Sequence, residues 1–239
     1  FEEKTRRGGD DLRERRIPPV IWQTWRSRPD PATPLGRQVR LLKARNPSHA
    51  YHFVDDKAQA AFMRTNVTGD VSKAYFSIDP ENGAARADLW RYCVLYRYGG
   101  WYIDLDVGCR APLQELHKAG DELAFAYERS PLPKNVPSAL GCVAPQTFDA
   151  NVSRLLSQRS FFRRRCIAQN IIGSAPGSLP LKAAIDRVVS SLREMKTARE
   201  AVCLQEYTPS KRDLAKNHSW TWLRTIWLTG PFALTVALR

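Results

Sequence analysis

The stretch from Asn82 to Val107 constrains the fold of this chain more than any other part of the sequence. Asn82 is a good helix N-cap, and apolar residues recur after it every three to four positions, which predicts a helix with one apolar face. Gly99 and Gly100 then end the helix, since glycine adopts left-handed backbone angles without steric cost. Residues 101–107 are β-prone and mostly apolar, so we predict a strand buried on both faces of a parallel sheet. The apolar helix positions are Ala85, Leu89, Tyr92 or Cys93, and Tyr96.

Two acidic residues, Asp104 and Asp106, lie near the end of this predicted strand. Because side chains alternate along a strand, both are expected to point to the same face. In open α/β sheets ligands bind outside the carboxyl ends of the strands. Paired carboxylates there suit Mg²⁺ or Mn²⁺, whose shell a substrate diphosphate and water commonly complete. The pair therefore indicates a cation site for a diphosphate substrate, although an Asp-x-Asp triplet also arises by chance.

Asp88 and Arg91 are three residues apart on the predicted helix and therefore share a face. If the helix packs beside the strand, both side chains can approach the same crevice. Both are costly to bury without a partner, so an internal ion pair or a solvated edge is the competing interpretation. Spacing alone does not choose between these interpretations.

The central block resembles the signature of glycosyltransferase family 32, which includes fungal Golgi mannosyltransferases. The resemblance is carried by RADLWRY at residues 86–92 and LYRYGGWYIDLDV at residues 95–107. Residues 17–25 resemble the first strand of that family, Pro-Gly at 176–177 its late turn, and Thr-Gly-Pro at 229–231 its C-terminal motif. The resemblance implies an α/β fold of the GT-A type, an α/β/α sandwich that binds a nucleotide sugar on a mainly parallel sheet.

The same resemblance implies roles for individual residues. A divalent cation, Mn²⁺ or Mg²⁺, is expected at Asp104 and Asp106. The donor-binding residues are expected to be Trp22, Asp88, Arg91, Tyr102, Asp104 and Asn170. The catalytic residues are expected to be Asp88, Arg91 and Glu128, the last of which follows a predicted strand that begins at Leu123.

Two of these assignments have ordinary structural alternatives. Trp22 is expected to stack on the nucleotide base, but tryptophan is often largely buried in a core. Asn170 is expected beside the donor, yet strands also contain structural asparagines.

The activity implied is that of a retaining, metal-dependent glycosyltransferase. It moves a hexose, mannose from GDP-mannose or another hexose from a UDP donor, to a hydroxyl of a glycan or glycolipid. A non-catalytic nucleotide-sugar or glycan-binding module with a degenerate GT-A site is the alternative, because a fold does not guarantee chemistry. A basic scaffold that binds anionic lipid or RNA is a third interpretation.

The composition bears mainly on partners and location. The 239 residues are 43% hydrophobic and 26% charged, as in an ordinary globular protein, with a net charge of +13. The basic residues are dispersed and no recognised nucleic-acid module accompanies them, which favours peripheral contact with an anionic membrane surface over nucleic acid. Sequons at Asn66, Asn151 and Asn217 favour a glycoprotein of the secretory pathway. With the resemblance, they suggest a Golgi-lumenal type II membrane protein whose anchor lies outside this chain.

The chain is expected to contain a flexible leader at residues 1–16 and a single GT-A domain at residues 17–239. Other strands are predicted at 17–24, 51–55, 123–128 and 141–144. Other helices are predicted at 34–45, from Asp55 or Asp56 to Met63, at 149–161 and at 179–195.

Overall fold

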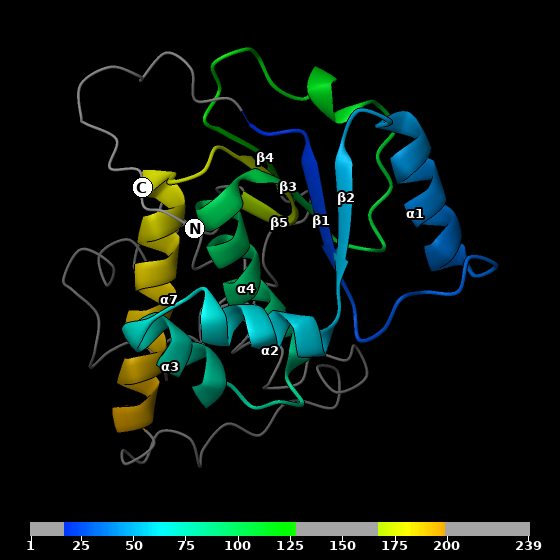
Figure 1. Ribbon diagram of the computed structural model, residues 1–239. Helices are drawn as coiled ribbons and strands as arrows, with labels where there is room; N and C mark the ends of the chain where they lie inside the picture. Colours follow the sequence, from blue (N-terminus) through cyan, green and yellow to red (C-terminus); the bar gives the residue numbers. More distant parts are fainter. Residues whose placement is uncertain (1–16, 128–166, 199–239) are drawn as a thin grey trace, which may run out of the picture.

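The computed structural model describes residues 17–127 and 167–198. Within them, five strands form one sheet in the order β2-β1-β3-β5-β4 (Figure 1). They are β1 (Val20–Thr24), β2 (Ala50–Val54), β3 (Gly100–Ile103), β4 (Leu123–Tyr127) and β5 (Ile167–Ser174). β1 is parallel to β2 and β3, whereas β5 is antiparallel to β3 and β4. Four strands therefore run in one direction and β5 opposes them, which confirms the α/β class.

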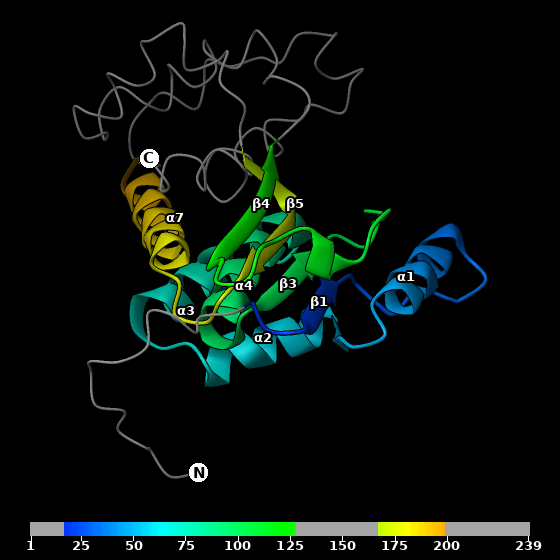
Figure 2. The same cartoon turned by 90° about the horizontal axis from the view of Figure 1, so that it is seen from above.

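The helices are distributed unequally over the sheet. They are α1 (Pro34–Arg45), α2 (Asp56–Thr65), α3 (Gly69–Ser77), α4 (Gly83–Tyr98), the short 3₁₀ turn η1 (Leu113–Glu115) and α7 (Leu179–Ala198). Figure 2 shows α2, α3 and α4 together on one side of the sheet, with α7 beside them and α1 standing apart at the β1 side. We call the side that α4 covers the α4 face.

Two hydrophobic clusters lie on the two faces of the sheet. The larger joins α4 to α2, α3, α7 and the sheet through residues such as Leu89 and Tyr102. The smaller joins Leu42 of α1 and Leu113 of η1 to Trp101 and Ile103. Because Trp101 and Ile103 alternate with Tyr102 along β3, the smaller cluster occupies the opposite face, which we call the α1 face.

The helix predictions that fall within the described residues hold in position, although the single apolar face predicted for one of them is wrong. α1 spans the predicted residues, and Thr33 caps it by accepting from Gly36 N at 3.1 Å. Asp55 caps α2, and Asn82 caps α4. The single apolar face predicted for α4 is wrong, because residues 88–95 are buried all round. α4 packs against the sheet and also against α2, α3 and α7, so each of its faces has a protein neighbour.

The junction between α4 and β3 requires glycine at two successive positions. Gly99 and Gly100 have φ of 68° and 98°, in the left-handed region that other residues rarely adopt. A Cβ on Gly99 would lie 2.8 Å from Ser174 O, and one on Gly100 would lie 2.6 Å from Val20 O. The two glycines therefore turn the chain directly from the buried helix into the buried strand.

The strand predicted at residues 101–107 is wrong in its second half. β3 ends at Ile103, and Val107 N donates to Asp104 O at 3.0 Å in a turn. Asp104 and Asp106 therefore follow the strand rather than belong to it, and strand alternation does not decide where they point.

Other boundaries also changed. The first strand begins at Val20, after both prolines, rather than at Ile17. α3 was not predicted. β5 occupies residues that were expected only to lead into the helix predicted at 179–195. The strand predicted at 141–144, the helix at 149–161 and the motif at 229–231 lie outside the described residues. Within the described ranges, no helix is long and apolar enough to cross a membrane.

Candidate functional site

Arg91 is the centre of a buried charged network on the α4 face. Its Nη2 lies 3.0 Å from Asp88 Oδ1, and both side chains are 7% exposed. Its Nη1 donates to the backbone oxygen of Gln169 on β5 at 2.9 Å. The guanidinium also lies over the ring of Tyr102, with Cζ 4.3 Å from the ring centroid. The shared helix face predicted for Asp88 and Arg91 is confirmed, and the pair holds α4 against the sheet.

Asp104 connects this network to the surface. Its Oδ1 accepts a hydrogen bond from the Tyr102 hydroxyl at 2.6 Å and lies 3.5 Å from Arg91 Nη2. The Asp104 side chain is 32% exposed, against 7% for Arg91. Because Tyr102 and Arg91 both contact Oδ1, the carboxylate is anchored on its inner side while it reaches solvent at the end of β3.

The electrostatics keep Arg91 and Tyr102 each in one protonation state. Burial alone lowers the pKa of Arg91, but Tyr102 and the carboxylates of Asp104 and Asp88 raise it, and the net direction is upward. Burial raises the pKa of Tyr102 well above its ordinary value, Arg91 opposes that shift, and the Asp104 carboxylate adds to it. Arg91 therefore stays charged, and Tyr102 stays a hydrogen-bond donor to Asp104.

Asp106 lies two residues further along the turn and is exposed. Asp104 and Asp106 together offer carboxylate oxygens at the carboxyl end of β3, which fits a hard divalent cation that takes its remaining ligands from a diphosphate and water. In residues 17–127 and 167–198, no three His, Cys, Asp or Glu side chains come together as a metal-binding group. The chemistry of the donor set thus fits a cation that a substrate helps to bind.

Two residues of the network were not predicted. Gln169 receives Arg91 through its backbone oxygen, and its side-chain amide donates to the Tyr92 hydroxyl. Burial raises the pKa of Tyr92 well above its ordinary value, and the nearby Asp88 raises it further. Tyr92 was treated only as an apolar helix position, whereas its spacing of four from Asp88 was the signal that it shares the same helix face.

Asn170 lies next to Asp104 in the sheet, as the donor-binding prediction requires. Its backbone oxygen accepts from Asp104 N at 2.9 Å, which extends the antiparallel pairing of β3 and β5 by one residue. The structure thus brings Asn170 to the end of β3, and its role toward a donor stays a prediction.

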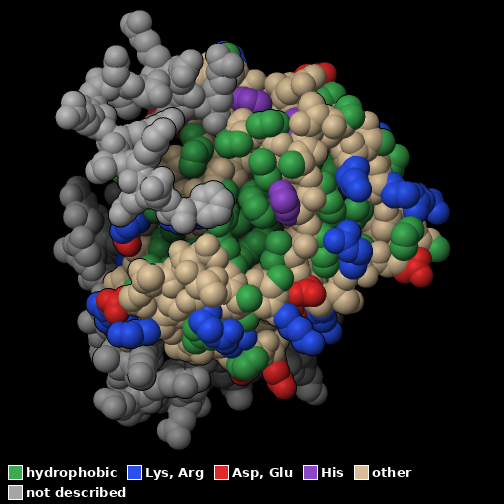
Figure 3. Space-filling model, viewed as in Figure 1, with side chains coloured by type: hydrophobic (Ala, Val, Ile, Leu, Met, Phe, Trp, Pro, Cys, Tyr) green, Lys and Arg blue, Asp and Glu red, His purple; other side chains and the backbone are tan. Residues whose placement is uncertain are grey.

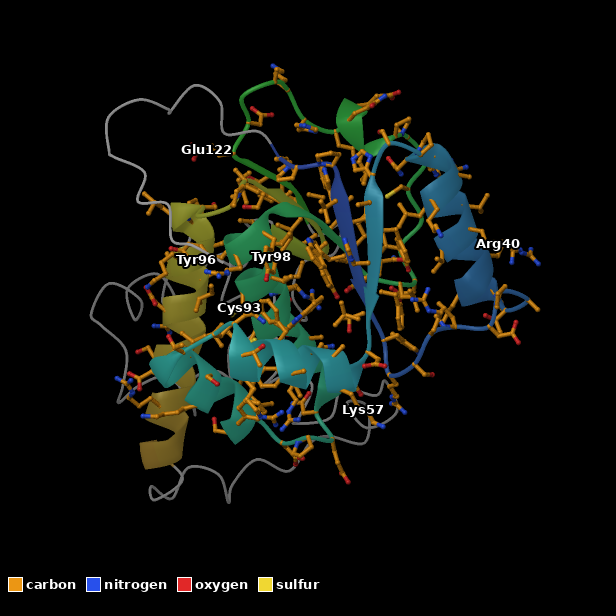
Figure 4. All side chains as sticks on the ribbon, viewed as in Figure 1. Arg40, Lys57, Cys93, Tyr96, Tyr98 and Glu122 are labelled. Atoms are coloured by element: carbon orange, nitrogen blue, oxygen red, sulfur yellow. The ribbon has the colours of Figure 1, made fainter. Side chains whose placement is uncertain are left out.

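Trp22 lies apart from this network. Its indole Nε1 donates to Gly99 O at 2.9 Å, before the start of β3, whereas Asp104 follows the end of that strand. The indole stacks on His52 at 4.6 Å and on Tyr98 at 5.8 Å between ring centroids. Figure 4 places Tyr98 in the middle of the view, where hydrophobic side chains gather in Figure 3. Base stacking by Trp22 stays a prediction.

Glu128 lies outside the described residues, so its catalytic assignment also stays a prediction. The structure therefore brings together Asp88, Arg91, Tyr102 and Asp104, with Asn170 and Asp106 beside them.

The fold defines the class of protein. The chain is similar to a solved structure described as "PaToxG Glycosyltransferase", with a TM-score of 0.52 and 14% identity. The similarity covers 93% of this chain and 69% of that one. At this level of identity it shows the fold alone, which is the GT-A type expected from the sequence.

The central segment identifies the sequence family more closely. Residues 36–124 match the family described as "Glycosyltransferase sugar-binding region containing DXD motif", which confirms the resemblance noted in the sequence. That segment includes Asp88, Arg91, Tyr102 and both turn aspartates.

Curated relatives come from fungi. Inositol phosphoceramide mannosyltransferase 3 and 2 of Schizosaccharomyces pombe are 35% and 39% identical over 100 residues. An initiation-specific alpha-1,6-mannosyltransferase of Candida albicans is 31% identical over 104 residues. These matches cover 41–42% of this chain and 26–28% of the relatives, so the similarity spans only about a quarter of their length.

Proposed function

We propose that this chain is the donor-binding part of a retaining, metal-dependent glycosyltransferase that transfers mannose from GDP-mannose to a hydroxyl of a glycan or glycolipid. The observation that carries the proposal is the buried Asp88–Arg91 pair joined to Asp104 at the end of β3, within the segment that matches the DXD family. Carboxyl ends of strands are where open α/β sheets bind their ligands.

Asp104 is the member of this network that reaches the donor. Arg91 and Asp88 are each 7% exposed, so Arg91 acts chiefly by holding the Asp104 carboxylate and Asp88 by holding Arg91. They reach a sugar hydroxyl only at their exposed edge. This arrangement fixes the orientation of Asp104 before any ligand arrives, and such positioning accounts for part of the rate enhancement in many enzymes.

Asp104 and Asp106 would hold the divalent cation, Mn²⁺ or Mg²⁺. When bound, the cation supplies electrostatic stabilisation for the negative charge that develops on the departing diphosphate. In this chain, Tyr102 and Arg91 both contact Oδ1 of Asp104, so its other oxygen would be the one that binds the cation. Asp106, which is exposed, completes the protein's contribution.

The names of the relatives support mannose as the sugar and a glycolipid as the acceptor. We place the enzyme in the Golgi lumen at an anionic membrane surface. Asn66 supports a lumenal location because its sequon is exposed at the end of α2. Lys and Arg side chains lie around the edge of the face in Figure 3 rather than in one patch on its described residues, which fits diffuse membrane attraction better than nucleic-acid recognition.

The proposal is tested by donor turnover with the purified chain. GDP-mannose, UDP-galactose, UDP-glucose and UDP-N-acetylglucosamine are compared with and without Mn²⁺, using hydrolysis and transfer to a mannosylatable glycolipid. We expect turnover of GDP-mannose only with the metal and loss of turnover in Asp106→Ala. Asp186→Ala is the control, because that exposed residue pairs with Lys182 one turn away on its own helix, where such pairs contribute little.

Three outcomes would contradict particular parts of the proposal. Turnover that persists in Asp106→Ala would overturn the metal role. A preferred UDP donor would overturn the mannose assignment, and an inverted anomeric centre in the product, read by NMR, would overturn retention.

A non-catalytic nucleotide-sugar-binding module is the second candidate. It is favoured by the observation that the described residues hold no metal-binding group of three side chains. Such a module would bind GDP-mannose equally well in the presence of a chelator and would turn over none of the four donors.

A further inference from the structure

Gln23 is a buried polar residue on the α1 face, and its side chain connects three strands. It lies on β1 and is 1% exposed. Its Nε2 donates to the backbone oxygens of Ile103 at 3.2 Å and Asp104 at 3.3 Å. Its Oε1 accepts from the Tyr51 hydroxyl on β2 at 3.0 Å.

These bonds take the place of backbone pairing between β1 and β3, which stops before Ile103. The parallel register of β1 and β3 runs only through Trp22 and Tyr102. The following carbonyls, of Ile103 and Asp104, receive the Gln23 amide instead. A buried backbone carbonyl left without a donor is costly, and Gln23 supplies the donor for Ile103 O, whereas Asp104 O also accepts from Val107 N at 3.0 Å. The Gln23 side chain therefore joins the end of β3 to β1.

The backbone and the carboxylate of Asp104 are thus held from opposite faces. Its N–H donates to Asn170 O, and its C=O accepts from Gln23. Its carboxylate is held on the α4 face by Tyr102 and Arg91. The Asp104 carbonyl accepts from both Gln23 Nε2 and Val107 N, so Gln23 contacts the group that closes the turn in which Asp106 lies.

We propose that Gln23, oriented by Tyr51, is a positioning residue of the cation site formed by Asp104 and Asp106. The inference rests on the metal role in the proposed function. Glutamine is required because its amide donates to two carbonyls while it accepts from the tyrosine, whereas glutamate has no N–H and methionine neither donates nor accepts strongly. Burial raises the pKa of Tyr51 to about 12, so its hydroxyl keeps the proton that it donates.

The test compares two buried glutamines of similar setting. Gln59 is 2% exposed, and its Nε2 donates to Thr24 Oγ1, next to Gln23 along β1. Gln23→Met, Gln59→Met and Tyr51→Phe are made in the full chain. Each is measured for its unfolding free energy by urea denaturation and for its Mn²⁺ Kd, with and without GDP, by electron paramagnetic resonance.

We expect both methionine variants to lose stability, but only Gln23→Met to bind Mn²⁺ more weakly. Substitution of residues that orient metal ligands commonly weakens metal binding by about 10- to 100-fold, and we expect a loss in that range. Tyr51→Phe should shift the Mn²⁺ Kd in the same direction by less, since it leaves the amide in place.

Equal Mn²⁺ binding by Gln23→Met and Gln59→Met would overturn the positioning role. If Gln23→Met does not fold, an unchanged Mn²⁺ Kd in Tyr51→Phe would overturn it instead. If the wild-type chain binds no Mn²⁺ even with GDP, the metal role in the proposed function fails and this inference fails with it. If the chain binds Mn²⁺ but transfers no sugar, the transferase proposal fails. The Mn²⁺ Kd values of the variants then still decide whether Gln23 is a positioning residue.

Discussion

The two faces of the sheet hold the same residue, Asp104, by different chemistry. On the α4 face, a charged guanidinium and a phenol hold its carboxylate. On the α1 face, a neutral amide holds its backbone oxygen. The charged contacts lie on the face where four helices and the larger hydrophobic cluster surround them.

The difference shows how burial decides which chemical groups can hold Asp104 on each face. An ion pair that is 7% exposed is stable only when further polar groups contact it, and for Arg91 these are the Asp104 carboxylate after β3 and the Gln169 backbone oxygen on β5. The α1 face has a smaller cluster and uses contacts to the backbone. There Asn46 Oδ1 accepts from Leu113 N at 2.8 Å, and Arg45 donates to Cys109 O at 2.9 Å. The α4 face orients the Asp104 carboxylate, and the α1 face holds the backbone of the loop that follows β3.

Removal of Arg91 should cause the largest loss of stability among the variants that compare the two faces. Arg91→Met leaves the Asp88 and Asp104 carboxylates without their common cation, and loss of one partner from a buried pair costs about 3–5 kcal/mol. Arg97→Met, on the same helix but exposed, should change stability by less than about 0.5 kcal/mol. Urea denaturation of both variants measures the difference. Similar losses would show that the α4 face does not depend on the charged network.

Leucine truncation compares the hydrophobic clusters directly. Leu89 on the α4 face is 0% exposed and Leu42 on the α1 face is 2% exposed. Leu→Ala substitutions in cores cost about 2–5 kcal/mol, with larger values where the site cannot collapse. We expect Leu89→Ala near the upper end, because packed helices surround it, and Leu42→Ala near the lower end. Thermal and urea unfolding check the order, and a larger loss for Leu42→Ala would reverse the comparison.

Substitution of Asp104 and Asp106 in turn should separate an effect on stability from an effect on metal binding. Asp104→Ala removes the acceptor for Tyr102 and one partner of Arg91, and loss of such bonds costs about 1–3 kcal/mol. Asp106→Ala removes an exposed side chain and should change stability by less than about 0.5 kcal/mol. Both should lose Mn²⁺ binding, measured by titration calorimetry. Retained binding in either variant would remove that aspartate from the cation site.

Among the residues that the structure describes, each face carries one cysteine, and the difference in their reactivity is the smallest expected effect. Burial raises the pKa of Cys93 on α4 to about 12 and also raises that of Cys109, which the nearby Arg45 opposes (Figure 4 labels Cys93). Only the thiolate reacts with iodoacetamide. Between about pH 7 and pH 9, we therefore expect labelling at Cys109 to exceed that at Cys93, as measured by peptide mass spectrometry. Equal rates would show that the α4 face opens as readily as the α1 face.

The same shift affects stability at alkaline pH. The pKa of Cys93 is higher in the folded chain than its ordinary value of 9.0, so the folded state keeps a proton that the unfolded state releases. This contribution to stability is complete below about pH 9 and is lost as the pH rises toward about 12. Cys93→Ala should flatten the fall in unfolding free energy over that interval.

Local signals were sufficient to predict several elements. The bounds of α1, the caps at Asp55 and Asn82 and the glycine junction after α4 depend on residues within one or two turns of each other. The pairing of Asp88 with Arg91 follows from helical spacing in the same way. These features could be predicted because the groups that interact are close in the sequence.

The end of β3 could not be predicted from such signals. Its residues are β-prone through Val107, but β1 pairs with β3 only through Tyr102, β5 pairs with it only through Ile103, and the chain then turns. Burial of α4 on all sides was likewise set by helices far away in the chain.

The sequence by itself determined that α1, α2, α4 and α7 form, that two glycines end α4 and that Asp88 and Arg91 share a helix face, because these features depend on short-range backbone geometry. Only the tertiary structure decided that Arg91 meets Asp104 and Gln169, and that Gln23 meets the carbonyl after β3. Those contacts join residues up to 81 positions apart. They exist because sheet order and helix packing bring distant groups together. No local pattern of residue types predicts which distant residues will meet.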